Sequence, residues 1–392
     1  MKKTIKDFEL KSKTVIIRCD LNVPMTDGII TDDTRIRSSL RTIKYAINAS
    51  AKVVLLSHLG KVKKEEDKKD NSLYPVSIKL SEYLNQPVLF SRETSGIKLK
   101  DKVRNLKEKE VLLIENTRFE DLNGEKESKC DLELSKYWAS LGDIFINDAY
   151  GSCHRKHASI VGIPKYLPSG VGFLVEKELR KIDSILNSKA HPFIVILGGK
   201  KVEDKITLIE KLLEKCDKLL IGGAMSFTFL KALGYNIGSS IIANEHLSFC
   251  TKILKKYPQK ILLPKDFKVS KDNINVEVKD IENFSDEDVG YDIGPKTIKA
   301  FEKELKTAKR VIINGPMGLF EDKRFSDGTK QVFKILEKNK IKTLVGGGDT
   351  ASAANKLGYS SSFYHISTGG GATLKYIEDG KLIGIEEVDN EG

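Results

Sequence analysis

Short apolar runs recur along this chain, and the residues that end them differ between its two halves. In the second half the runs lead straight into glycine, as in IVILGGK, KLLIGGA, VIINGPMG, TLVGGGDT and YHISTGGG. In the first half they end on charge, as in TVIIRCDLN, KVVLLSHLGK, EVLLIENTRF and DIFINDAYGSCHRKH. Buried parallel strands have such continuous apolar sequences, and open α/β sheets bind ligands beyond the carboxyl ends of their strands. The pattern therefore predicts two parallel sheets with two different ligands.

The segments between these runs carry apolar residues at helical spacing, as the stretch 31–50 does. Strands that alternate with helices are typical of βαβ units and parallel sheets. The charged segment 61–70 has a single apolar residue, and we expect a flexible surface loop there. Further helices are expected at 74–84, 129–141, 204–215, 226–233, 295–307, 326–338 and 349–358.

The length of the chain predicts two domains. Its 392 residues exceed the roughly 250–300 at which a single core stops growing. Two domains of about 170–200 residues each are therefore expected. The segment 173–190 places Leu174, Leu179, Ile182 and Leu186 on one helical face, and it is the candidate connector.

Composition narrows the class of protein. Hydrophobic residues at 40% and charged residues at 31% are typical of a globular protein. The five cysteines are odd in number and widely spaced, which favours reduced thiols over a disulfide framework. The N-terminal sequence lacks a secretory signal pattern, and no apolar run reaches the ~18 residues of a spanning helix. We expect a cytoplasmic enzyme.

The net charge of +11 admits nucleic acid, an acidic membrane surface or anionic small molecules as partners. Many lysines lie beside acidic residues, as in KVKKEEDKKD, which is typical of a solvated surface rather than of a nucleic-acid groove. A nucleic-acid-binding protein is thus a hypothesis that rests on the basic pI alone. We expect small-molecule partners, with neither nucleic acid nor a membrane required.

One glycine motif admits three interpretations. Gly346, Gly348 and Ala351 form a GxGxxA sequence after the run TLV, and such sequences occur both in dinucleotide sites and in tight turns that bind nothing. A dinucleotide site would need an acidic residue at the end of the next strand to bind the ribose, and SFYHIST has none there. A phosphate or adenine cradle therefore explains the motif better than an NAD-dependent dehydrogenase, which is the competing hypothesis.

Two lysines, Lys201 and Lys205, lie four residues apart where LGGKKVEDKI enters a helix expected to begin near Val202. Lysines at a helix N-terminus oppose the helix dipole, so a bound anion would supply the compensating charge; two ordinary surface lysines are the alternative. Asp349 could cap a helix, bind magnesium or do both. Glu321 could bind ribose hydroxyls.

A second group of candidate residues follows the runs of the first half. Side chains at the ends of neighbouring strands converge at one sheet edge, where several cations would repel one another unless an anion lay between them. A single arginine or histidine would be structural, but the group predicts a site for a small, multiply charged substrate. Its members are Asp20, Asn22, Arg35, His58, Lys61, Arg118, Arg155 and His157.

Taken together and in order, the motifs of the chain resemble those of the phosphoglycerate kinase family over essentially its whole length. They are IIRCDLNVP, DDTRIRSSL, LLSHLGK, IENTRF, NDAYGSCHRKHAS, LGGKKVEDKI, GGAMSFTFLKALG, YDIGPKT, INGPMGLFE, VGGGDTASA and HISTGGGATL. The resemblance implies two Rossmann-like α/β domains with a cleft and a hinge between them. The N-terminal domain would comprise 1–172 and 373–392, the hinge 173–190 and the C-terminal domain 191–372.

The resemblance also implies an activity: reversible phosphoryl transfer between 1,3-bisphosphoglycerate and Mg-ADP, giving 3-phosphoglycerate and Mg-ATP, by a monomeric glycolytic enzyme. By motif position, the phosphoglycerate would contact Asp20, Leu21, Asn22, Arg35, His58, Leu59, Gly60, Lys61, Arg118 and Arg155. The nucleotide would contact Lys205, Gly290, Glu321, Gly347, Gly348, Asp349 and Thr350, with Mg²⁺ on Asp349. The residues implied to act on the transferring group are Arg35, Lys201, Gly370 and Gly371.

The chain departs from the family pattern at a few positions. Lys61 and Val62 stand where arginine and proline are usual, and Lys61 keeps the charge but not the bidentate geometry of an arginine. Lys200 stands where alanine is common, and Ile313 where tryptophan is frequent. Because the acceptor of the reverse reaction is an ionised carboxylate, no general base is required, and catalysis would come from positioning and charge neutralisation after domain closure.

Overall fold

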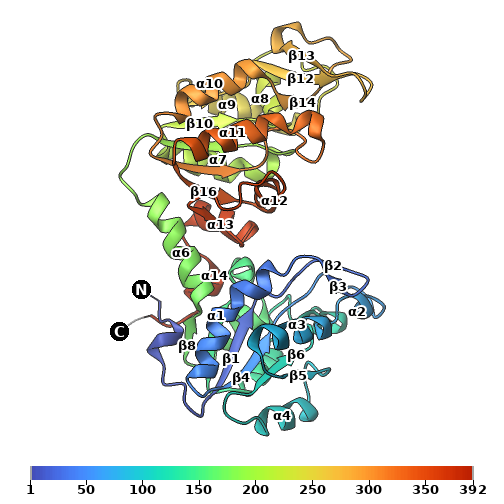
Figure 1. Ribbon diagram of the computed structural model, residues 1–392, viewed down its shortest axis with the longest axis vertical. Helices are drawn as coiled ribbons and strands as arrows, with labels where there is room; N and C mark the ends of the chain where they lie inside the picture. Colours follow the sequence, from blue (N-terminus) through green and yellow to red (C-terminus); the bar gives the residue numbers. More distant parts are fainter. Residues whose placement is uncertain (1, 391–392) are drawn as a thin grey trace. The chain divides into compact units, whose positions relative to one another are not determined.

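The structure is a computed structural model that describes residues 2–390, except for the side chain of residue 204. The chain divides into two compact units, Met1–Arg180 with Asp379–Gly392 (unit 1) and Lys181–Glu378 (unit 2), both visible in Figure 1. The helix α6 (Phe173–Leu186) crosses the boundary. These limits differ from the domain limits expected from the sequence, which stay a prediction.

Unit 1 is built on a six-stranded sheet with the order β5-β6-β4-β1-β7-β8, in which every pairing is parallel. The four charge-ended runs form the adjacent strands β6, β4, β1 and β7, so their carboxyl ends lie side by side at one edge of the sheet. The strand bounds are β1 (Thr14–Cys19), β4 (Lys52–Leu56), β5 (Val88–Ser91), β6 (Val111–Ile114), β7 (Ile144–Asp148) and β8 (Ser169–Val171).

Helices cover both faces of this sheet because successive strand residues point to opposite sides. Val15 and Ile17 pack in one core with Ile36 of α1, whereas Ile16 packs in a second core with Trp138 of α5. Burial on both faces explains the continuous apolar sequence of the strands. The helix bounds are α1 (Thr34–Asn48), α3 (Tyr74–Leu84), α4 (Ile97–Arg104), α5 (Leu132–Ala139) and α14 (Ile383–Glu386).

The segment 61–70 is not the irregular loop that its composition predicts. It ends in a short helix, α2 (Asp67–Asp70). The carboxylate of Asp67 accepts hydrogen bonds from the backbone N–H groups of Lys63 at 2.8 Å and Lys64 at 3.1 Å. One aspartate thus satisfies two backbone donors and fixes the turn before the helix, and the prediction of a flexible loop was wrong in this part.

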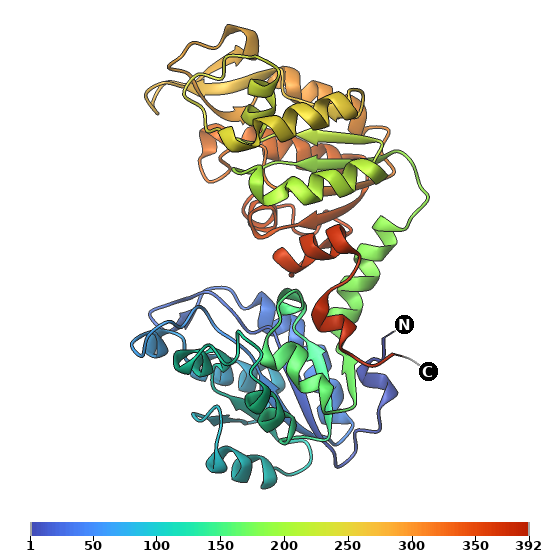
Figure 2. The same ribbon diagram turned by 180° about the vertical axis from the view of Figure 1, so that it is seen from behind.

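Both ends of the described chain lie in unit 1. The backbone N–H of Lys3 donates to the carbonyl of Asp389 at 2.9 Å, and Asn147 at the end of β7 donates to the carbonyl of Gly384 in α14 at 2.9 Å. Figure 2 shows the two ends side by side. The C-terminal segment therefore packs on the strand end that precedes the charged residues of unit 1.

Unit 2 is built on a second parallel sheet, with the order β11-β10-β9-β15-β16-β17. All five glycine-ended runs form strands of this sheet, so its carboxyl edge is rich in glycine. Two parallel sheets flanked by helices confirm the α/β fold class expected from the sequence. The strand bounds are β9 (Phe193–Leu197), β10 (Lys218–Ile221), β11 (Ile261–Leu262), β15 (Arg310–Asn314), β16 (Lys342–Gly346) and β17 (His365–Ile366).

The helices of unit 2 bury the sheet much as those of unit 1 do. Ile194 of β9 and Val311 of β15 share a core with Phe301 of α10 and Phe333 of α11. Figure 1 labels these helices around the sheet. Their bounds are α7 (Ile206–Lys215), α8 (Ser226–Ala232), α9 (Leu247–Lys256), α10 (Pro295–Leu305), α11 (Asp327–Lys338), α12 (Gly348–Lys356) and α13 (Gly371–Asp379).

A small antiparallel sheet of order β13-β12-β14 was not predicted. Its strands are β12 (Asp266–Ser270), β13 (Glu277–Asp280) and β14 (Val289–Ile293). Phe267 of β12 packs on Phe227 of α8, with ring centroids 4.6 Å apart, and on Phe284 at 5.8 Å. This aromatic core holds β14 beside α8, and β14 carries the candidate residue Gly290.

All five cysteines are free, in agreement with the expectation of reduced thiols. Within residues 2–390, none of the helices combines the length and the apolar character that crossing a membrane requires.

Candidate functional site

The charged residues of the first half gather at the carboxyl edge of the unit 1 sheet. Asp20, His58 and Arg118 follow β1, β4 and β6, and Arg155 follows β7. Burial is the main cause that holds the pKa of His58 well below its usual value, and the charges of nearby arginines, Arg118 and Arg155 among them, lower it further. His58 is therefore neutral near neutral pH, and the arginines supply the positive charge of this edge.

Arg18 belongs to this edge, although the sequence analysis missed it. It is fully buried, its Nε donates to Ser159 Oγ at 2.8 Å, and its Nη2 lies 3.2 Å from Nδ1 of His58. A guanidinium only donates hydrogen bonds, so Nδ1 of His58 accepts and its proton lies on Nε2. A cation inside an otherwise apolar strand needs a buried partner within the protein. The arginine in the apolar run TVIIRCD was therefore the sequence signal for a buried ion pair.

The buried charge of Arg18 is balanced by Glu127, which is also fully buried. Ser159 connects the two residues: its Oγ donates to Glu127 Oε1 at 2.5 Å and its backbone N–H to Oε2 at 2.9 Å. His157 Nδ1 lies 3.9 Å from Glu127, and burial, followed by the charge of Arg118, lowers the pKa of His157 to about 3. His157 is thus a neutral residue rather than a second cation for an anionic ligand.

Asp20 and Arg35 form an ion pair at the same edge. Arg35 Nη1 of α1 donates to Asp20 Oδ2 at 2.6 Å, and the other oxygen, Oδ1, is buried without a hydrogen-bond partner. The Arg35 side chain is 35% exposed. The unpartnered oxygen of Asp20 can accept a hydrogen bond from a ligand hydroxyl, and the accessible guanidinium of Arg35 can bind an anionic group. The pair therefore suits a ligand that carries both.

Arg118 is held in place by its own loop. Its Nη1 donates to Ser128 Oγ at 2.9 Å and to Asp121 Oδ2 at 3.2 Å, while its buried Nε has no partner. Arg155, in contrast, is exposed, and its Nε lies 3.4 Å from His154 Nε2. Of these two arginines, Arg118 therefore has the more hydrogen-bond partners within the protein, and Arg155 is the more exposed.

The remaining candidates of unit 1 come from two neighbouring loops. Asn22 Oδ1 accepts the backbone N–H of Gly60 at 2.8 Å, which ties the loop after β1 to the loop after β4. Leu21 and Leu59 are buried, so only their backbone groups could face a ligand. Lys61 is exposed to solvent.

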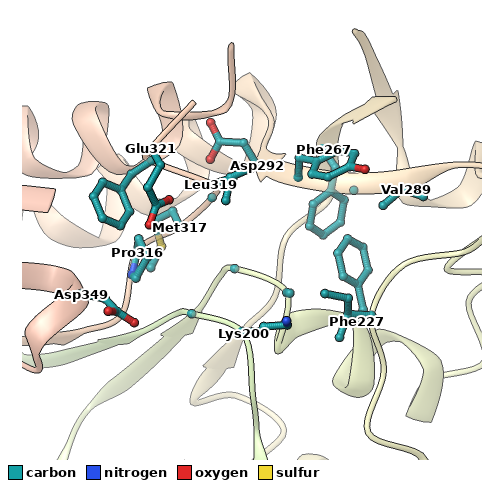
Figure 3. Close-up of a pocket in the computed structure, with 18 residues that line it drawn as sticks. Lys200, Phe227, Phe267, Val289, Asp292, Pro316, Met317, Leu319, Glu321 and Asp349 are labelled. Atoms are coloured by element: carbon teal, nitrogen blue, oxygen red, sulfur yellow. The ribbon is translucent and has the colours of Figure 1, made fainter. Parts of the chain in front are cut away.

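Unit 2 holds an apolar cavity of about 370 Å³ between the carboxyl edge of its main sheet and the small antiparallel sheet. Figure 3 shows Phe227 and Phe267 on one side of it and Pro316 and Met317 on the other. Gly290 lies in its wall, where an added Cβ would lie 2.2 Å from Phe227 Cζ. The aromatic wall was not foreseen, because the sheet that carries part of it was not predicted.

A second cavity, of about 400 Å³, adjoins the first, since Gly199, Lys200 and Asp349 line both. The helices α12 and α13 begin at this second cavity, and helix N-termini attract anions such as phosphate. The cavity thus combines helix N-termini with cations, which suits a polyphosphate. Its lining residues also include Lys201, Lys205, Gly315, Gly347, Gly348, Thr350, Gly370 and Gly371.

The two lysines that were paired in the sequence have different environments. Lys205 is buried, and its Nζ donates to the backbone carbonyl of Gly198 and to that of Asn314 at 3.2 Å. Lys201 is 57% exposed and lies 3.5 Å from Glu203. The helix begins at Ile206, after a 3-10 turn, rather than near Val202. Lys205 therefore joins the ends of β9 and β15, whereas Lys201 is the more exposed of the two lysines at this cavity.

The glycine run after β16 forms the floor of the second cavity. Gly347 has φ of +87°, in the left-handed region, and is the N-cap of α12. Thr350 is buried, and its Oγ1 accepts the backbone N–H of Gly315 at 2.6 Å, so its hydroxyl ties the first turn of α12 to the residue that follows β15. Among the residues expected to contact the nucleotide, the hydroxyl of Thr350 thus already has a hydrogen-bond partner within the protein. At Gly348, in contrast, no atom lies within 4 Å of where a Cβ would be.

Asp349 lies in the first turn of α12 and is not its N-cap, which overturns one of the two roles considered for it. It is exposed and lines both cavities. Within residues 2–390 no group of three acidic, histidine or cysteine side chains could hold a metal by itself. Mg²⁺ commonly binds through one or two carboxylates, substrate phosphates and water. The single carboxylate of Asp349 beside the second cavity, which suits a polyphosphate, therefore fits that ion.

Glu321 is also exposed, and it lines the apolar cavity.

Comparisons with known proteins agree with this geometry. The family described as phosphoglycerate kinase matches residues 5–381. A phosphoglycerate kinase of Fusobacterium nucleatum subsp. nucleatum is 52% identical over 398 residues, and one of Macrococcus caseolyticus is 50% identical over 395 residues; both alignments cover 100% of each chain.

Solved structures give the same result. The phosphoglycerate kinase of Coxiella burnetii superposes with a TM-score of 0.88 at 35% identity, and that of Pyrococcus horikoshii OT3 with a TM-score of 0.85 at 32% identity. Each comparison covers 99% of this chain and 98% of the other. On the combined strength of its two parallel sheets, its cavities and these full-length matches, the chain belongs to the phosphoglycerate kinase family.

Proposed function

We propose that this chain catalyses the reaction of its family by positioning two anionic ligands and neutralising charge, without a general base. The reaction is the reversible transfer of a phosphoryl group between 1,3-bisphosphoglycerate and ADP in glycolysis. The observation that carries the mechanism is the pair of adjoining cavities in unit 2, one apolar and one lined by glycines, lysines and helix N-termini.

The nucleotide would place its base in the apolar cavity, against Phe227 and beside Gly290, with Glu321 near the ribose hydroxyls. Its phosphates would lie against the N-termini of α12 and α13, near Gly347, Gly348 and Thr350. Mg²⁺, bound to the phosphates, would be held by Asp349 and would neutralise phosphate charge. Lys205 supports this arrangement through the two carbonyls that it joins.

The phosphoglycerate would bind at the carboxyl edge of the unit 1 sheet. Arg118 and Arg155 supply charge for its phosphate and carboxylate, and the unpartnered oxygen of Asp20 suits its hydroxyl. His58 adds an uncharged donor, because its Nε2 carries the proton. The loops that hold Leu21, Asn22, Leu59, Gly60 and Lys61 would complete this site.

The chemical step needs no proton acceptor. The carboxylate of 3-phosphoglycerate is ionised at neutral pH, so it attacks the terminal phosphorus of ATP in line and ADP leaves. Lys201, Arg35 and the backbone N–H groups of Gly370 and Gly371 would neutralise the charge on the phosphoryl oxygens, which is the main catalytic contribution in this class of reaction. Because the ligands have separate sites, we infer a closing motion hinged at 173–190 that also excludes water.

The function is tested by following ATP formation from ADP and 1,3-bisphosphoglycerate with purified protein. We expect turnover that depends on both substrates and on Mg²⁺, together with protection against thermal unfolding by ADP. Absence of ATP formation, combined with protection by NADH and none by ADP, would favour the dehydrogenase alternative instead. The expectations of a monomer and of a cytoplasmic location stay predictions.

A further inference from the structure

Lys200 occupies a special place in the nucleotide region of unit 2. It follows β9 across Gly198 and Gly199, and its side chain lines both the apolar cavity and the glycine-rich cavity. Figure 3 shows it at the lower edge of the apolar cavity, on the same side as Asp349. Lys201 and Lys205 line only the glycine-rich cavity. Lys200 is thus the lysine at the junction of the two cavities.

The backbone of this junction is fixed by its neighbours. Gly198 N–H donates to the carbonyl of Asn314 at 2.9 Å, and Gly199 N–H donates to that of Pro316 at 2.8 Å. The carbonyl of Gly199 accepts the N–H of Met225 at 3.1 Å. The loop is therefore bonded to the residues at and just after the end of β15 and to the residue before α8, which holds the Cα of Lys200 at the rim of the cavities, and its side chain is exposed.

The ion-pair environments of the three lysines differ. Among the described side chains, Lys200 has no ion-pair partner, whereas Lys201 lies 3.5 Å from Glu203 and Lys205 is buried against carbonyls. An exposed ammonium beside other cations is unfavourable in the empty protein and becomes favourable when an anion binds.

We infer that Lys200 forms an ion pair with the phosphate nearest the ribose of the bound nucleotide and so raises the affinity for nucleotides over nucleosides. This inference rests on the proposed function, which puts the base in the apolar cavity and the terminal phosphates in the glycine-rich one. The first phosphate of such a ligand lies at the junction of the cavities, where Lys200 stands. The residue is a binding residue for that phosphate, whereas Lys201 is assigned to the transferring group.

The test compares Lys200→Ala with Lys211→Ala, which removes the same charge from an exposed position of α7 outside both cavities. Binding of ADP, AMP and adenosine is measured by calorimetry at low and at high salt. We expect Lys200→Ala to weaken ADP and AMP binding by roughly threefold to tenfold at low salt, because a partly exposed ion pair contributes about 1 kcal/mol. Adenosine binding and the melting temperature should stay unchanged, and high salt should reduce the difference.

Three results would overturn the inference: equal ADP affinity in Lys200→Ala and the wild type, an equal loss for adenosine, or the same loss in Lys211→Ala. A loss for adenosine would mean that Lys200 packs on the base rather than on a phosphate. Failure of the proposed function looks different, because the wild type itself would then neither bind ADP nor form ATP. Lys200→Arg serves as the conservative variant, and it should retain most of the affinity for AMP.

Discussion

Nη2 of the buried Arg18 lies 3.2 Å from Nδ1 of His58. Since Arg18 can only donate, this contact gives His58 one neutral tautomer, with its proton on Nε2. In the proposed phosphoglycerate site, His58 would therefore be an uncharged hydrogen-bond donor, and its contact with Arg18 would set its orientation. The affinity of the proposed site for anions would then depend on its arginines and not on the protonation of His58.

The first prediction concerns that tautomer. In ¹⁵N-labelled protein, NMR should show His58 as neutral, protonated on Nε2, at pH 8 and still at pH 5.5, because burial and the nearby arginines lower its pKa. A lowered histidine pKa adds stability above the unfolded value near 6.5 and loses it as the pH falls. Arg18→Met should release the ring to a mixture of tautomers. Titration of His58 near pH 6.5 in the wild type would contradict this account.

The second prediction concerns Asp148 at the end of β7. Its Oδ1 accepts the backbone N–H of Leu174 at 2.9 Å at the start of α6, while its Oδ2 is buried without a partner. Burial raises its pKa to about 7. A raised carboxyl pKa stabilises the fold fully below the unfolded value near 3.9, and this contribution is lost as the pH rises to about 7.

Asp148→Asn, which resembles the protonated acid, should remove that loss. Relative to the wild type, its free energy of unfolding should increase by on the order of 2 kcal/mol between pH 5 and pH 8, measured by urea denaturation. Asp101→Asn, an exposed change in α4 of the same unit, controls for net charge and should follow the wild type. A constant offset between Asp148→Asn and the wild type across this pH range would refute the assignment.

The third prediction uses two adjacent glycines. Gly347 has φ of +87°, and an added Cβ would lie 2.5 Å from Asn314 Nδ2, whereas at Gly348 no atom lies within 4 Å. Gly347→Ala should lower the free energy of unfolding by roughly 2 kcal/mol through left-handed strain and crowding. Gly348→Ala should leave it within about 0.5 kcal/mol, since it lies in a helix. Equal effects in thermal unfolding would show that the turn is not constrained as described.

The fourth prediction concerns magnesium. Asp349→Asn should raise the Mg²⁺ concentration for half-maximal activity by roughly tenfold, about 1.4 kcal/mol, because it removes the carboxylate beside the phosphate cavity. The matched control is Asp327→Asn, since Asp327 also lies in the first turn of a helix, α11, but lines neither cavity. An unchanged Mg²⁺ requirement in Asp349→Asn would assign the metal to another group.

Much of the fold could be predicted because a strand buried on both faces has an unbroken apolar sequence, as Val15, Ile16 and Ile17 show. The small antiparallel sheet could not, since its strands are short and no residue of β13 is buried. Because the sheet was not predicted, the aromatic wall that it forms with Phe227 was not predicted either. Without this sheet the shape of the apolar cavity could not be predicted, although the parallel main sheet of the unit was.

The candidate site was predictable in its residue types more than in their roles. The sequence shows that lysines lie beside glycines. It does not show that Lys205 is buried against two carbonyls while Lys201 is exposed. It also offered Asp349 as a helix cap, whereas the positive φ of Gly347 gives that position to the glycine. Such differences depend on packing between segments that are distant in the sequence. The role of Arg18 was not predicted for the same reason: its partners Ser159 and Glu127 lie far along the chain.

The central claim is that Lys201 neutralises the transferring phosphoryl group in a reaction without a general base. It is tested most directly by the turnover number for ATP formation from ADP and 1,3-bisphosphoglycerate in Lys201→Ala, with Lys211→Ala as the charge-matched control. We predict a fall of at least about 100-fold, or 2.7 kcal/mol, in Lys201→Ala at saturating substrates, and no fall in the control. A turnover number of Lys201→Ala within about tenfold of the wild type would contradict the account.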